Sequence, residues 1–278
     1  MTVDMEMLHA RLLGMMKEFH RVCLENGLRY YLLGGSALGA RRHGGFIPWD
    51  DDMDVAMPRE DYERLKQIAG RVLPDHLELR DYSTRASWPM HFMKLIDART
   101  TLIERSFQNC VEGLYIDVFP LDGSLHPQSA RERLRFGRAW FYKAICMYHC
   151  TSDKRSSPIK ELLRRWARTR NLRAAHERIE RLIVRYPYRD SQWCVNYLGA
   201  WGAREYMPKS VFGTPVLYAF EDAEFYGPER IDAYLTSLYG DFMKLPPKEE
   251  RTPRHDYHFL SFDIPYREYV EAEHIRTD

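Results

Sequence analysis

Residues 30–58 read YYLLGGSALGARRHGGFIPWDDDMDVAMP. This stretch contains, in order, an apolar run, a Gly-Gly-Ser turn, the start of a helix and a segment with alternating acids. The largely apolar residues 28–33 predict a short buried strand, and residues 52–57 predict a second strand that Pro58 ends. Strands and helices thus alternate over a short distance, which favours an α/β or α+β core.

The Gly-Gly-Ser turn is suited to binding a phosphate group. Gly34 and Gly35 let the backbone approach an anion closely, and free N–H groups at the start of the following helix point toward it. Ser36 can add a hydroxyl donor and cap the helix. Ordinary tight turns also use Gly-Gly-Ser, so the acids that follow decide the interpretation.

The alternating acids predict a metal site. Asp52 and Asp54 are separated by one residue, so on a strand both carboxylates emerge on the same face. They repel each other unless a cation lies between them, and hard oxygen ligands favour Mg²⁺ or Mn²⁺. Asp117, in LYIDVFP on an expected neighbouring strand, is a third candidate ligand. Two ions about 3.5–4 Å apart would clamp the attacking and leaving oxygens of a phosphoryl transfer.

Other interpretations of these acids remain at this point. Consecutive acids such as those at 50–52 are typical of a solvated turn, and Asp117 could be a hydrogen-bonded acid at a strand end. Acids at 50, 52, 54 and 61 also mimic a calcium loop. However, Val55 replaces the glycine that such a loop needs, and Pro58 breaks its helical context. The combination of glycine turn, alternating acids and later acid favours a metal–phosphate site.

The rest of the chain predicts an α+β fold with a mixed sheet and an added helical region. Apolar spacing predicts a helix over 5–23 and another after Pro58, and strands are expected at 90–96, 99–104 and 113–119. Residues 128–186 are helical and Arg-rich in pattern, and one clear helix is expected at 229–239. We therefore divide the chain into a catalytic core (1–125), an Arg-rich helical region (126–186) and a C-terminal segment (187–278) that packs back on the core.

Composition limits the possible partners and compartment. The 278 residues carry a formal charge of only +1, so we expect that the protein does not bind nucleic acid. No apolar run approaches the roughly 18 residues of a spanning helix, and the opening MTVDMEM is not typical of a secretory signal. Five scattered cysteines favour reduced thiols. A cytoplasmic protein is expected, with contact at the inner face of the membrane.

Three blocks of sequence resemble the LicD family of phosphotransferases, relatives of fukutin and fukutin-related protein. They are GGSALGARRHGGFIPWDDDMDV, then GLYIDVFPLDG at 113–123, and YLTSLYGDFMKLPP at 234–247. The resemblance spans most of residues 25–260, although the family often has a basic residue at the position of Gly44. It implies a nucleotidyltransferase-like core in which Asp52, Asp54 and Asp117 hold magnesium.

The resemblance also implies an activity. It is transfer of a phospho-alcohol, typically phosphocholine from CDP-choline or another CDP-alcohol, to a sugar hydroxyl of a surface glycan or teichoic-acid precursor. In this scheme Asp117 positions or deprotonates the acceptor hydroxyl. Arg41, Arg42 and Lys94 are candidate phosphate contacts, and each could equally be an ordinary structural residue.

A choline group would need aromatic faces around its quaternary ammonium. Trp49, Trp88 and Tyr115 flank the expected site in sequence and are candidates, although aromatic side chains usually belong to the core. His255 and His258 follow the C-terminal block, and for both we expect a surface or core position.

The helical region concentrates positive charge. Residues 154–185 contain eleven Lys and Arg and only three acids, although the whole chain has a charge of +1. Arg178, Arg181 and Arg185 recur at steps of three and four beside an apolar stripe. The pattern predicts a face that guides an anionic, lipid-linked acceptor and contacts anionic membrane. The alternative is a solubilising surface with scattered ion pairs.

Two other functions stay open. A nucleotidyltransferase would use the same turn and acids but attack the α-phosphorus of an NTP and move NMP to a small molecule. A non-catalytic nucleotide-binding regulator should lack at least one of the acids, and all three are present.

Overall fold

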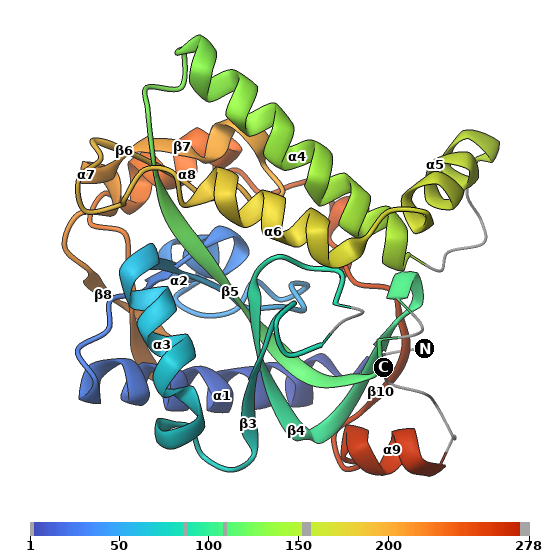
Figure 1. The fold of residues 1–278 in the computed structure, drawn as a ribbon. Helices are drawn as coiled ribbons and strands as arrows, with labels where there is room; N and C mark the ends of the chain where they lie inside the picture. Colours follow the sequence, from blue (N-terminus) through green and yellow to red (C-terminus); the bar gives the residue numbers. More distant parts are fainter. Residues whose placement is uncertain (1–2, 86–87, 108–109, 152–156, 273–278) are drawn as a thin grey trace.

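The computed structural model describes residues 3–85, 88–107, 110–151 and 157–272. Eight strands form a mixed sheet with the path β1-β2-β5-β4-β10, in which β3 also pairs with β4, and β6 links β5 to β7 (Figure 1). β2 and β5 run parallel, and the other pairs are antiparallel. The sheet strands are β1 (Tyr31–Leu32), β2 (Asp54–Pro58), β3 (Leu77–Arg80), β4 (Met93–Glu104), β5 (Glu112–Ser124), β6 (Trp193–Val195), β7 (Tyr206–Pro208) and β10 (Tyr257–Ser261).

The first helix forms where its spacing predicts. α1 (Met5–Glu25) begins where the Asp4 carboxylate accepts the Met7 N–H at 3.1 Å, and it ends before Gly27, which has a φ of 62°. Its buried stripe packs into the main core. α3 (Arg59–Val72) follows β2 directly and buries Tyr62, Leu65 and Ala69. Both expected helices are confirmed.

Two local predictions need correction, and one strand was missed. Residues 34–36 form the first turn of α2 (Gly34–His43) and not a turn before it, while Gly44 ends that helix with a φ of 68°. The two strands expected at 90–96 and 99–104 are one strand, β4, whose pairing with β5 shifts register between Asp97 and Leu102. β3 was not predicted, because its alternating sequence, LELR, is only four residues long and most of its side chains are half-buried.

The Arg-rich region is helical, as expected. α4 (Ala130–Cys150) and α6 (Leu172–Ile183) lie side by side across one side of the sheet, whereas α5 (Pro158–Arg168) projects at its margin (Figure 1). The predicted apolar stripe of α6 faces the core. Lys154 and Arg155, counted above in the basic segment, lie outside the described residues.

The remaining residues return to the sheet. β6 pairs with β5 and β10 pairs with β4, so strands from beyond residue 187 extend the sheet. The helix expected at 229–239 is α8 (Ile231–Tyr239). The other elements here are η2 (Gly202–Glu205), α7 (Lys209–Phe212), the hairpin β8 (Val216–Phe220) and β9 (Ala223–Gly227), η3 (Lys248–Glu250) and α9 (Tyr266–Ala272); η1 (Arg105–Phe107) follows β4.

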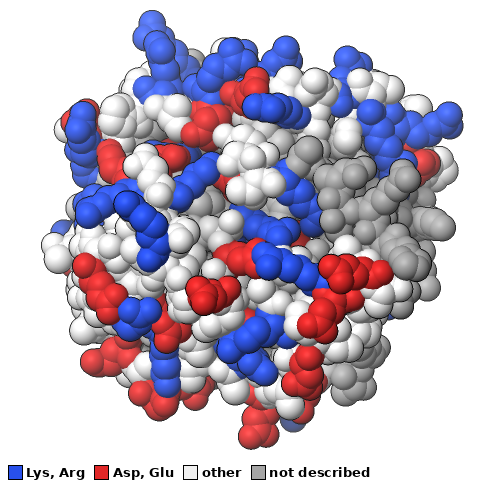
Figure 2. Space-filling model, turned by 60° about the horizontal axis from the view of Figure 1, so that its bottom comes forward, with Lys and Arg blue, Asp and Glu red and all other residues white. Residues whose placement is uncertain are grey.

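The surface charge is unevenly distributed. In Figure 2, Lys and Arg crowd the upper rim of the molecule, whereas Asp and Glu are most frequent on its lower half. Within the described ranges, no helix combines the length and apolar character needed to cross a bilayer.

Candidate active site

The register of the sheet places three charged side chains in a row. Asp54 on β2 is the pairing partner of Asp117 on β5, and Asp117 is in turn the partner of Lys94 on β4. Lys94 Nζ lies 3.0 Å from Asp117 Oδ1. The parallel pairing of β2 with β5 therefore brings together two acids that are 63 positions apart in the sequence.

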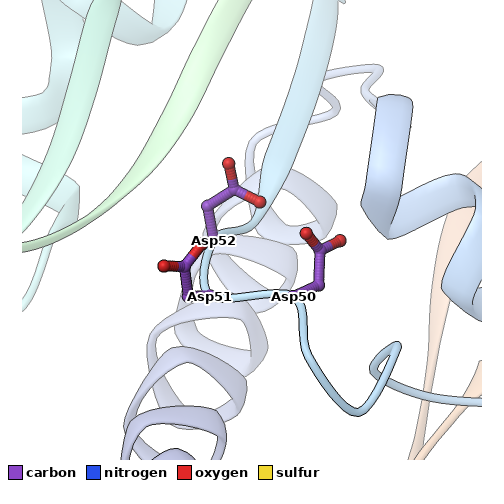
Figure 3. A group of neighbouring side chains, drawn as sticks. All are labelled: Asp50, Asp51 and Asp52. Carbon is purple, nitrogen blue, oxygen red and sulfur yellow. The ribbon is translucent and has the colours of Figure 1, made fainter. Parts of the chain in front are cut away.

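The acids before β2 join this row. The carboxylates of Asp50, Asp51 and Asp52 lie near one another (Figure 3), with one oxygen of each within 4.8 Å of the others. Asp50, Asp52, Asp54 and Asp117 line one open cavity of about 260 Å³. The cavity is also lined by Leu33, Gly34, Gly35, Phe119, Asn196, Gly199, Ala200, Trp201, Glu205, Tyr234, Tyr239, Arg254 and His255.

Asp51 anchors the acidic segment to the end of the chain. Its carboxylate accepts the backbone N–H groups of Arg254 and His255 at 3.3 and 3.0 Å and pairs with the His255 ring at 3.0 Å. The Tyr257 hydroxyl donates to the Asp51 carbonyl at 3.1 Å. Only 2% of Asp51 and 9% of Asp50 are exposed, so the interpretation as a solvated turn is wrong.

The start of α2 packs closely against the acids. A Cβ added at Gly35 would lie 2.2 Å from Asp50 Oδ2, and one at Gly34, whose φ is 49°, would lie 3.1 Å from Asp54 Oδ2. The Gly34 N–H donates to the Tyr234 hydroxyl at 2.9 Å, and Ser36 Oγ accepts the Asp54 N–H at 2.9 Å. The glycines thus form part of the cavity wall, while Ser36 holds the backbone of β2 in place.

The electrostatics of the cluster favour a bound cation. Burial raises the pKa of Asp54 well above its ordinary value, and the negative charges of Asp52, Asp117 and Asp50 reinforce the shift. Burial also raises the pKa of Asp52 and of Asp117. Within the described chain, Asp117 Oδ1 accepts no well-directed hydrogen bond, although Lys94 is near. Converging, poorly neutralised carboxylates are suited to Mg²⁺ or Mn²⁺.

The positive groups at the cavity differ from those that the sequence suggested. Arg254 and His255 line the cavity. We expected a surface or core position for His255, and this expectation is wrong, whereas His258 is exposed as expected. Burial alone would lower the pKa of His255, but the hydrogen bond to Asp51 and the charges of Asp52 and Asp51 raise it to about 9. The only sequence signal for either residue is its place just after the C-terminal block.

The basic candidates on α2 lie at its far end. Arg41 pairs with Asp232 of α8 at 2.7 Å, and Arg42 donates to the Phe242 carbonyl at 2.8 Å. Neither lines the acidic cavity, but Arg42 lines a neighbouring cleft of about 360 Å³ that shares Gly35, Asp50, Tyr239 and Arg254 with it. This cleft is also lined by Leu38, Ile47, Trp49, Asp241, Phe242, Lys244, Leu245, Pro246, Pro247 and Glu250.

An aromatic wall with a buried carboxyl completes the acidic cavity. The rings of Trp201 and Tyr239 meet edge to face, with centroids 4.7 Å apart. Glu205 beside them is 5% exposed, and within the described residues its one hydrogen bond is from the Trp201 N–H, at 3.4 Å. Burial raises the pKa of Glu205 to about 7. Phe119, two residues after Asp117 on β5, adds a third ring.

The aromatic residues suggested by the sequence lie elsewhere. Trp88 is buried in the core, and Lys94 Nζ lies 3.0 Å above the centroid of the Tyr115 ring. Trp49 belongs to the neighbouring cleft, under the guanidinium of Arg251. Proximity in the sequence did not identify the aromatic residues of the cavity, because the rings that reach the cavity come from distant segments.

Comparison with known proteins finds one domain family and relatives that are named as transferases of different phospho-alcohols. Residues 27–142, which include Asp52, Asp54 and Asp117, match the LicD/FKTN/FKRP, nucleotidyltransferase domain. The chain is 28% identical to the lipopolysaccharide cholinephosphotransferase LicD of Haemophilus influenzae over 255 residues, covering 87% of this chain and 92% of that protein. It is 52% identical over 44 residues to the ribitol 5-phosphate transferase FKRP of Homo sapiens and Mus musculus, covering 16% of this chain and 9% of those proteins.

Proposed function

The chain belongs to the LicD family and is a transferase, and from this premise we propose that it transfers phosphocholine from CDP-choline to a sugar hydroxyl and releases CMP. One observation carries the choice of donor. A single cavity joins the acidic row to an aromatic wall with a buried carboxyl, so a phosphate and a cation can bind side by side.

The two clefts suit the parts of the donor. The diphosphate lies in the cavity that the start of α2 and the row of acids line together, with Arg254 and His255 as positive contacts. The quaternary ammonium lies against Trp201 and Tyr239 with Glu205 as its counter-ion. Cytidine occupies the neighbouring cleft. On this assignment Arg42 is a contact of the nucleoside side, and Arg41 takes no direct part.

The chemistry is a displacement at the phosphorus that carries choline. The acceptor oxygen forms a bond to this phosphorus, the bond from it to the oxygen shared with CMP breaks, and CMP leaves with that oxygen. Asp117 orients the acceptor hydroxyl and takes its proton, while Lys94 holds the Asp117 carboxylate in place. Mg²⁺ held by Asp52, Asp54 and Asp117 would supply neutralisation of the phosphate charge.

The remaining features of the proposal follow from the family. The core is nucleotidyltransferase-like, the acceptor is a lipid-linked glycan or teichoic-acid precursor, and the reaction takes place in the cytoplasm. The test is to incubate the protein and Mg²⁺ with a panel of CDP-alcohols and NTPs and to assay CMP and pyrophosphate. CMP from CDP-choline, and tighter binding of CDP-choline than of CTP in titration calorimetry, would support it. Pyrophosphate from an NTP, with no CMP from any CDP-alcohol, would favour nucleotidyl transfer instead.

We expect Glu205→Gln to reduce selectivity for a cationic donor. Glutamine keeps an acceptor for the Trp201 N–H but removes the negative charge beside the ammonium. The KM for CDP-choline should rise about tenfold, whereas the KM for the neutral CDP-glycerol should change little. Steady-state kinetics with both donors measure this. Equal changes for both donors would rule out Glu205 as the choline counter-ion without affecting the proposed transfer itself.

The same carboxyl predicts a pH dependence. Its pKa of about 7 means that Glu205 is largely protonated below neutrality in the free protein and ionised above it. Since only the ionised form attracts a cation, the ratio of kcat/KM for CDP-choline to that for CDP-glycerol should rise with pH through neutrality and then level off. Glu205→Gln should flatten this ratio. A ratio that is independent of pH in the wild type would contradict the assignment.

A further inference from the structure

α5 packs against the protein through Arg164 and Ala167 and leaves its large apolar side chains in solvent. Ile159, Leu162, Leu163 and Trp166 recur at helical spacing and form one stripe, and they are 73%, 68%, 41% and 39% exposed. On another side of the helix Arg164 and Ala167 are 4% and 1% exposed. A surface helix normally does the reverse, because burial of its apolar stripe stabilises it.

The exposed stripe continues onto α4. The ring of Phe141, which is 52% exposed, lies 6.1 Å from that of Trp166. Leu134, 65% exposed, lies seven residues earlier on α4 and so on the same side of that helix. Single exposed apolar residues are ordinary, but the contact of Phe141 with Trp166 joins the exposed apolar side chains of two helices, and a contiguous group of this kind marks an interaction surface.

Basic side chains surround this apolar group. At 100° per residue, Arg165 borders one edge of the α5 stripe, and Lys160 is exposed in the first turn of the helix, beyond the opposite edge. The Arg170 guanidinium lies 4.6 Å from the centroid of the Trp166 ring. The acid on α5, Glu161, pairs with Arg164 at 3.4 Å. Residues 157–185 hold nine Lys and Arg against three acids, in keeping with the separation of charge in Figure 2.

We propose that α5, together with Phe141 and Leu134, docks onto the surface of an anionic lipid bilayer. Leucine, isoleucine and tryptophan on one face, flanked by Lys and Arg, are the composition of helices that lie in the membrane interface. The apolar side chains enter the boundary between headgroups and acyl chains, and the basic ones contact anionic headgroups. The charge complementarity selects lipid over a second copy of this basic surface. The proposal goes beyond phosphocholine transfer, because lipid binding requires no donor.

The test is flotation with vesicles of phosphatidylcholine, with and without phosphatidylglycerol. We expect the wild type to bind only the anionic vesicles. The variant Ile159→Gln/Leu162→Gln/Trp166→Gln should lose on the order of tenfold or more in affinity. Lys160→Gln/Arg165→Gln should lose less, mainly at low salt. The control Met7→Gln/Leu24→Gln removes side chains of α1 that are 45% and 51% exposed and should bind as the wild type does.

Because the substituted side chains are exposed, melting temperatures should be unchanged, so a loss of binding cannot be attributed to unfolding. Three results would overturn the proposal. They are no binding by the wild type, unchanged binding by the triple variant, or a wild-type oligomer that the triple variant dissociates, which would assign the surface to a second copy of the chain.

Discussion

Asp52→Asn and Asp54→Asn should each reduce turnover by on the order of 100-fold or more. Both carboxylates line the cavity beside Asp117, and Asp54 is directly opposite Asp117 in the parallel pair of strands. An amide of the same shape is neutral and a poorer ligand for a hard cation, so charge stabilisation in the transition state is lost. The measurement is CMP release from CDP-choline at saturating Mg²⁺.

Folding should survive both substitutions. The half-buried acids repel one another, which is one reason why the pKa of Asp54 is raised, so removing one charge relieves this repulsion in the metal-free protein. We therefore expect a melting temperature in chelator that is equal to or higher than that of the wild type. Asp222→Asn, at a carboxylate that is 72% exposed, is the matched control and should be fully active. Near-normal turnover in either active-site variant would show that the substituted aspartate is not part of the catalytic centre.

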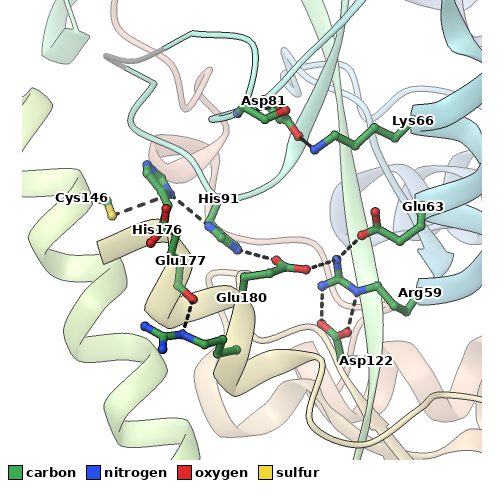
Figure 4. Close-up of polar contacts among 12 residues, drawn as sticks. Arg59, Glu63, Lys66, Asp81, His91, Asp122, Cys146, His176, Glu177 and Glu180 are labelled. Carbon is green, nitrogen blue, oxygen red and sulfur yellow. Dashed lines mark hydrogen bonds and ion pairs between the residues drawn. The ribbon is translucent and has the colours of Figure 1, made fainter. Parts of the chain in front are cut away.

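Asp122→Ala should lower the free energy of unfolding by about 3 kcal/mol. Its carboxylate accepts two hydrogen bonds from the Arg59 guanidinium, at 2.7 and 2.9 Å, where α3 meets β5 (Figure 4). The side chains of Asp122 and Arg59 are 1% and 11% exposed. Removing one partner leaves a buried guanidinium with an unfilled site, which costs far more than the intact pair contributes.

Glu63 provides the comparison, because it pairs with the same guanidinium at 2.9 Å but is 42% exposed. Glu63→Ala should cost under about 1 kcal/mol, since water replaces an exposed partner. Urea unfolding of both variants measures the difference. Similar costs for Asp122→Ala and Glu63→Ala would mean that burial does not set the strength of this contact.

Figure 4 also shows why the pair matters for the architecture. Glu180 of α6 lies 3.4 Å from Arg59 Nη1 and 2.9 Å from the ring of His91, and His91 in turn lies 3.0 Å from His176. These contacts join α3, the β4 side of the sheet and the basic helical region. None was predicted, because a buried ion pair between residues 63 positions apart leaves no local pattern.

Local physics determined much of this protein from the sequence. The spacing of apolar residues specified α1, α3 and α6, because the periodicity of a helix is set within a few residues. The alternation of Asp52 and Asp54 placed both on one side of an extended segment for the same reason. Asp117 followed from its apolar strand context, and the family followed from three long motifs.

Only the tertiary structure decided what surrounds those acids. The parallel pairing of β2 with β5 set Asp54 against Asp117, and Lys94 became the neighbour of Asp117 through β4. Residues beyond 187 contribute Arg254, His255, Trp201 and Glu205 to the cavity. The aromatic wall is therefore formed by this part of the chain and not by Trp88. Strand register and long-range closure depend on the packing of the whole core, so a pattern confined to neighbouring residues cannot specify them.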